Sequence, residues 1–73
     1  MIMVLLYSED FRTRDIYLDY PFEDVKFRWD KQTEKVYRRY YGKKEDEVDH
    51  SSDMFHQAIA AGTEITRDEY YRD

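Results

Sequence analysis

Two histidines and two aspartates form the densest group of potential metal ligands in the chain. They lie within the segment DHSSDMFH, residues 49–56. Asp53 and His56 are three residues apart, so on a helix they would share an edge and could hold a transition metal together. A helical wheel places His56 on the polar side of that helix, and His50 could approach only through a suitable loop conformation. We keep Asp53 and His56 as weak candidate ligands and expect no metal site.

Nucleophilic catalysis has little support in the chain. Ser51 and Ser52 follow His50 directly, but sequence neighbours rarely form a nucleophile–base pair, and helix capping already explains the serines. The chain has no cysteine, which excludes thiol chemistry and disulfides. It also lacks a glycine-rich phosphate loop, a GxSxG elbow and an HExxH motif. We therefore expect a protein without enzymatic activity and without a cofactor.

Basic and aromatic side chains are interleaved in residues 26–44. This segment has eight basic and two acidic residues, whereas residues 1–25 have six acids and two bases and residues 45–73 have nine acids and two bases. Since opposite charges attract, we expect the acidic flanks to fold near the basic centre. The same segment could stack nucleic-acid bases and contact phosphates. The pI near 4.9 opposes that use, so nucleic-acid binding through residues 26–44 is an alternative. In a second alternative, the acidic C-terminal block mimics nucleic acid and acts as an inhibitor.

Apolar residues alternate with polar ones in a way that predicts strands. Residues 2–6 are continuously apolar, which is typical of a strand covered on both faces. Residues 14–20 and 25–30 alternate, and residues 36–41 have strand composition. The segment 43–49 is predicted to be a charged connection. The inward-facing set on the two alternating segments would be Ile16, Leu18, Tyr20, Val25, Phe27 and Trp29.

A hairpin over residues 25–41 is the firmest structural prediction. Asp30 opens a four-residue turn, and if it faces Lys35, then Trp29 pairs with Val36. A slip by one residue would turn different tyrosines inward, so the register stays open. Glu34 occupies a position that often needs a left-handed backbone, where glycine or asparagine is usual.

Capping residues predict a helix over residues 51–61 and a helical turn near the C-terminus. Ser51 or Ser52 can cap the helix, and Gly62 can end it. Thr66 and Glu69 form a capping box for the last turn. The apolar stripe that the helix would turn toward the sheet is Met54, Phe55, Ala58 and Ile59.

Together these elements predict one α+β domain over residues 1–73. It would have a small, mainly antiparallel sheet of 3–4 strands, with the helix packed on one face and a terminal helical turn. The eight tyrosines exceed what so small a core can hold, so we expect a non-catalytic protein-interaction module that binds a protein partner or itself, as a homo-oligomer. The contact surface would use residues 2–6 and the hairpin residues Arg28, Tyr37, Arg39 and Tyr41. The apolar start is too short for a membrane helix, so we expect no membrane association and a cytoplasmic protein, compatible with an accessory protein of a phage or mobile element.

Overall fold

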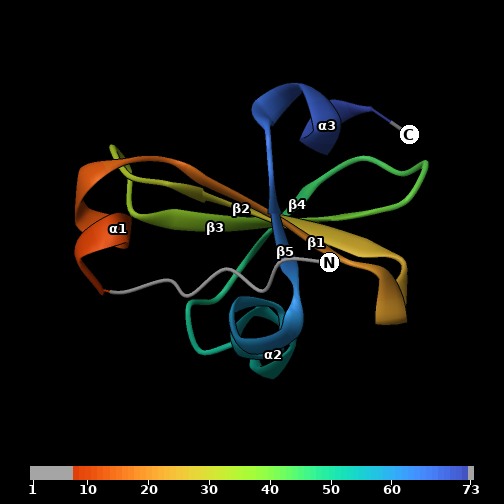
Figure 1. Ribbon diagram of the computed structural model, residues 1–73, viewed down its shortest axis with the longest axis horizontal. Coiled ribbons are helices and arrows are strands. Elements are labelled where there is room, and N and C mark those ends of the chain that lie inside the picture. Colours follow the sequence, from red (N-terminus) through yellow and green to blue (C-terminus); the bar gives the residue numbers. More distant parts are fainter. Residues whose placement is uncertain (1–7, 73) are drawn as a thin grey trace.

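The computed structural model describes residues 8–72, in which a five-stranded antiparallel sheet carries helices on both faces (Figure 1). The strands lie in the order β4-β3-β2-β1-β5. They are β1 Ile16–Tyr20, β2 Val25–Asp30, β3 Lys35–Tyr40, β4 Asp46–Val48 and β5 Thr63–Ile65. The helices are α1 Ser8–Thr13, α2 Asp53–Ala61 and α3 Arg67–Tyr71, and a 3-10 turn, η1 Pro21–Glu23, joins β1 to β2. The α+β prediction is confirmed.

The hairpin of β2 and β3 has the first of the two registers considered. Asp30 pairs with Lys35 and Trp29 with Val36. The predicted left-handed position is also confirmed, because Glu34 has a φ of 57°. The Asp30 carboxylate closes the turn by accepting hydrogen bonds from the two backbone N–H groups of residues 32 and 33.

The core lies between the sheet and α2. Phe55 of α2 packs on Phe27 of β2, with ring centroids 5.7 Å apart. Phe11 of α1 packs edge-on against both Trp29 and Phe55 and closes one end of the core. The predicted inward face of the sheet is confirmed, since its members Ile16, Leu18, Val25 and Phe27 are buried and Tyr20 and Trp29 pack against them.

Three short elements differ from the sequence prediction. Residues 46–48 form β4, so the prediction of a plain connection over residues 43–49 is wrong there. Residues 63–65 form β5, and residues 8–13 form α1. Each three-residue strand is too short to show a period, and each exists because a longer strand pairs with it, β3 in one case and β1 in the other. The strand predicted over residues 2–6 lies outside the described residues.

The ends of α2 follow from local chemistry. The Ser52 hydroxyl accepts a hydrogen bond from the backbone N–H of Phe55, which confirms the capping serine. Gly62 follows the last turn in an extended conformation, with a φ of −82°. A Cβ at Gly62 would lie 2.5 Å from the carbonyl oxygen of Ala58 and 2.8 Å from that of Asp19. Glycine is therefore required here for the close approach of α2 to β1, and not for a left-handed turn.

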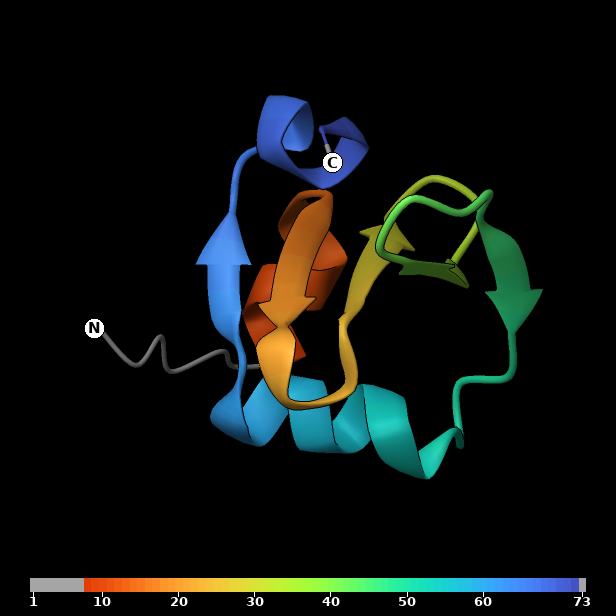
Figure 2. The ribbon, with the colours of Figure 1, turned by 90° about the vertical axis from the view of Figure 1, so that its right-hand side faces the viewer.

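The helix α3 covers the face of the sheet opposite to α2. Figures 1 and 2 show α2 below the sheet and α3 above it. The predicted capping box is confirmed, because Thr66 and Glu69 exchange both hydrogen bonds. Tyr70 is fully buried, with its ring 5.5 Å from the ring of Tyr17 on β1. Within residues 8–72, no helix is long and apolar enough to cross a membrane.

We expect Glu34→Gly to raise the free energy of unfolding by about 0.5–1 kcal/mol. A residue with a side chain is strained at a φ of 57°, and glycine removes that strain at some cost in chain entropy. Urea denaturation measures the change. Gln32→Gly is the control, because this turn residue has no positive φ and the substitution should lower stability. Equal destabilisation by both variants would contradict the prediction.

Candidate interaction surface

The outer face of the hairpin, which the sequence singled out, holds α3 in place. Lys26 and Arg39 are both 9% exposed. The Lys26 ammonium donates to the carbonyl oxygens of Glu69 at 2.6 Å and Arg72 at 2.5 Å, and the Arg39 guanidinium donates to that of Tyr70 at 3.3 Å. Carbonyls at the end of a helix lack partners within the helix, and cations there also complement its dipole. Two buried cations thus fasten the C-terminal end of α3.

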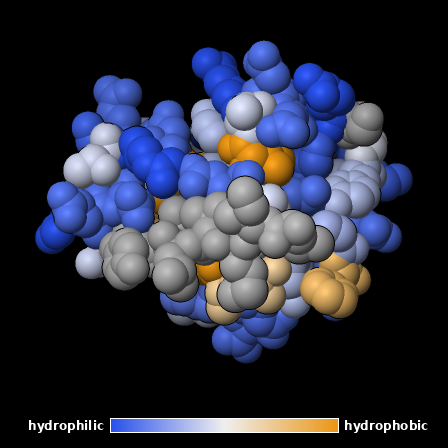
Figure 3. Space-filling view, in the orientation of Figure 1, coloured by the Kyte–Doolittle hydropathy of each residue, from blue (hydrophilic) through white to orange (hydrophobic). Residues whose placement is uncertain are grey.

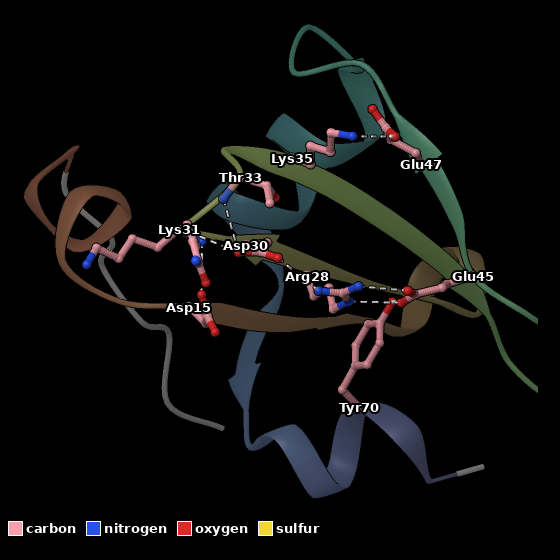
Figure 4. A network of polar contacts seen from close by, with 10 residues as sticks. Asp15, Arg28, Asp30, Lys31, Thr33, Lys35, Glu45, Glu47 and Tyr70 are labelled. Atoms are coloured by element: carbon pink, nitrogen blue, oxygen red, sulfur yellow. Dashed lines mark hydrogen bonds and ion pairs between the residues drawn. The ribbon is translucent and has the colours of Figure 1, made fainter.

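A second set of contacts joins Arg28, Glu45 and Tyr70 (Figure 4). The Arg28 guanidinium donates to both carboxylate oxygens of Glu45, at 2.9 and 2.8 Å, and the Tyr70 hydroxyl donates to one of them at 2.9 Å. The hydrogen bond from Arg28, with help from that of Tyr70, lowers the pKa of Glu45. Burial and the bond to Glu45 raise the pKa of Tyr70. Glu45 is therefore an ionised acceptor and Tyr70 a neutral donor at neutral pH.

The expected attraction between the charged segments is confirmed for the basic centre and the acidic segment after it. Among the described residues, the ion pairs of the basic segment 26–44 are chiefly with acidic residues that follow it. Arg28 pairs with Glu45 at 2.8 Å, and two further pairs tie β3 to β4. Those pairs are Arg38 with Asp46 at 3.2 Å and Lys35 with Glu47 at 3.6 Å. Much of the basic charge on the hairpin is thus balanced inside the chain.

The four predicted contact residues lie in different surroundings. Arg28 stacks on the half-buried ring of Tyr37, 3.9 Å from its centroid, as expected for an arginine and a tyrosine across a sheet. Arg39 is buried beneath α3. Tyr41 is 37% exposed, and its hydroxyl donates to Asp19 at 2.5 Å. Burial and this bond raise the pKa of Tyr41. Tyr41 is thus the most accessible of the four, and no observation tests their role in binding.

The weak metal candidates do not come together as a site. The ring nitrogen Nε2 of His56 lies 2.9 Å from the carbonyl oxygen of His50, not from the His50 ring. The ring of His50 packs on Trp29 instead. Among residues 8–72, no group of three or more His, Asp and Glu side chains is arranged to hold an ion.

Sequence reasoning missed two kinds of residue. The contacts of Lys26 and Glu45 with α3 do not follow from the sequence, because alternation alone cannot show that a short helix will cover their face. Phe22 is not among the predicted contact residues, yet it is the most exposed large apolar side chain among the described residues. Its position between Pro21 and the acids Glu23 and Asp24 was the available signal.

We expect Glu45→Gln to lower the free energy of unfolding by about 1–2 kcal/mol at pH 7, because it weakens charge-assisted hydrogen bonds to Arg28 and Tyr70. The pKa of Glu45 is lowered in the folded state. The ionised Glu45 carboxylate therefore contributes fully to the free energy of unfolding above the ordinary glutamate pKa of about 4.3. This contribution is lost as the pH falls through the pKa of Glu45 in the folded protein. Urea denaturation should show that the difference in the free energy of unfolding between Glu45→Gln and wild type becomes smaller as the pH falls from 7 to 3. Glu47→Gln, at an exposed ion pair, is the control and should change little. A difference independent of pH would contradict this account.

Known proteins are similar to this chain in both sequence and fold. The profile of the family described as "Tis1 immunity protein" matches residues 3–73. The chain is 44% identical over 70 residues to the "Immune protein Tis1" of Pseudomonas aeruginosa (strain UCBPP-PA14), covering 93% of this chain and 91% of the relative. It is also similar to a chain in the crystal structure of the complex between the type VI effector Tas1 and its immunity protein. That match has a TM-score of 0.85 and 43% identity, over 92% of this chain and 91% of the other.

The family profile spans nearly the whole chain, and the relative from Pseudomonas aeruginosa is 44% identical to it. The side chains on the outer face of the hairpin hold α3 in place. The expectation of a protein-binding protein is confirmed at that level. The chain belongs to the Tis1 immunity protein family.

Proposed function

We propose that this protein binds a type VI effector similar to Tas1 and neutralises it by forming a stable complex. The observation that carries the proposal is the 43% identity and TM-score of 0.85 to a chain from a structure of Tas1 with its immunity protein. The similarity covers 92% of this chain and 91% of the other, so it involves nearly the whole fold described above. In this proposal, inhibition of the effector requires only binding and no chemistry by this chain.

The structure suggests how so small a chain supports a stable interface. Because α2 and α3 cover opposite faces of the sheet, both broad faces are largely used inside the protein. A partner is therefore met by side chains at the rim of the sheet and on its turns. Of the predicted contact residues, Tyr41 lies at such a rim. Arg39 donates to α3, and Arg28 and Tyr37 stack on each other.

The other functions considered from the sequence remain predictions. Self-association stays a prediction, and the complex in the related structure is with a different protein. Nucleic-acid binding through residues 26–44 is weakened because Arg28 and Arg39 already bind groups of the protein itself. No observation tests the acidic mimic or the cytoplasmic location.

We expect this protein to bind the Tas1-like effector of its own genome with a Kd below about 1 µM. Isothermal titration calorimetry measures binding, and growth of cells producing the effector with and without this protein measures neutralisation. The control pairs this protein with an unrelated type VI effector. It should neither bind that effector nor protect cells that produce it. No binding and no protection by the cognate pair would overturn the proposal.

A further inference from the structure

Phe22 is exposed to a degree that the fold does not require. Its side chain is 81% exposed, whereas the other exposed large apolar or aromatic residues among those described, Tyr41 and Tyr71, are 37% and 47% exposed. Both of those carry a hydroxyl that water can solvate, but a phenylalanine ring has none. Exposing an apolar ring forgoes the burial that would stabilise it. An exposed apolar ring that adjoins other apolar surface within a polar rim has the composition of a protein-interaction site.

The backbone that carries Phe22 is fixed on both sides. Pro21 opens the turn, and the backbone N–H of Asp24 donates to the Pro21 carbonyl at 3.1 Å. Asp24 has a left-handed backbone with a φ of 51°. Its carbonyl accepts from the N–H of Tyr41 at 2.9 Å, which ties the turn to the end of β3. The ring is therefore presented in one place before any partner arrives, which lowers the entropy lost on binding.

A shallow apolar hollow lies beside the ring. It has a volume of about 230 Å³ and is lined by Pro21, Phe22, Ala61 and Thr63. Ala61 ends α2 and Thr63 begins β5, so the hollow is built from three separate elements. Its small side chains leave room next to the ring for an apolar group of a partner. Figure 3 shows a hydrophobic patch at the lower right, where the turn between β1 and β2 lies, among hydrophilic side chains.

The charge around the turn is acidic. Glu23 and Asp24 are exposed and follow Phe22 directly. Within the part of the chain that the structure describes, neither carboxylate forms an ion pair, in contrast to the acids of β4. Asp19, which precedes the turn, accepts from Tyr41. A partner surface that surrounds the ring would be complementary if it carried arginine or lysine.

We propose that Phe22 is the anchor by which this protein holds its effector. The ring enters an apolar pocket of the effector, and arginine or lysine side chains at the edge of that pocket meet Glu23 and Asp24. This inference rests on the proposed function, and it adds the contact surface and the chemistry of the effector site. An aromatic anchor in a pocket with a polar rim is the usual form of an interface hot spot.

The test measures effector binding by variants at the turn. Phe22→Ala should raise the Kd about 25-fold or more, because an anchor contributes about 2 kcal/mol or more. Its melting temperature should stay within a few degrees of wild type, because the ring is already in solvent. The matched control is Tyr71→Ala, which removes an exposed aromatic ring from α3 and should change the Kd by less than about threefold. Phe22→Leu keeps an apolar anchor and should retain most of the affinity.

The acidic rim is tested separately. Glu23→Gln with Asp24→Asn removes both charges, and asparagine tolerates the left-handed backbone at position 24. Association should be slower and less dependent on salt than in wild type, since charges at a rim act mainly on the association rate. Unchanged rates would remove the charged part of the proposal.

The outcomes separate this inference from the proposed function. Binding by wild type with equal affinity for Phe22→Ala would overturn the anchor and leave the proposed function standing. No binding by wild type would overturn both, because the anchor presupposes the complex. A loss of affinity in Tyr71→Ala as large as in Phe22→Ala would place the contact on α3 and overturn the anchor as well.

Discussion

The packing of α3 on the sheet depends on the Glu45 carboxylate. It joins Arg28 on β2 to the Tyr70 hydroxyl on α3, and it immediately precedes β4. Three segments far apart in the sequence therefore meet at one ionised group. A helix of five residues is not stable in water alone. The helix α3 exists because Tyr70 is buried and because Lys26 and Arg39 bind its terminal carbonyls.

The contacts that hold α3 on the sheet limit which side chains are available to a partner. The cations that make residues 26–44 resemble a nucleic-acid surface are largely used to hold α3 and β4. With α2 on one face and α3 against β1 and β2 on the other, much of the sheet is covered by the protein itself. The side chains left for recognition lie where strands turn. At one of these turns a rigid backbone presents Phe22 to solvent.

The parts of the fold that depend on local chemistry could be predicted. The turn opened by Asp30, the strained Glu34 and the caps at Ser52 and Thr66 all follow from residue type and spacing. The strands β4 and β5 could not be predicted, because three residues show no period and their pairing is decided by neighbouring strands. The burial of Lys26 could not be predicted either, because it depends on packing against another element. Alternation marked it as outward-facing, and only the docking of α3 makes that face an interior. Membership of the Tis1 immunity protein family could not be deduced from any motif in the chain.

A structure of the complex between this protein and its effector tests the central claim most directly. The account predicts that the Phe22 ring lies in an apolar pocket of the effector, with an arginine or lysine of the effector within ion-pair distance of Glu23 or Asp24. It also predicts that α3 keeps its contacts with Lys26, Arg39 and Glu45. A complex in which Phe22 stays in solvent, or in which α3 leaves the sheet so that the hairpin face meets the effector, would contradict it.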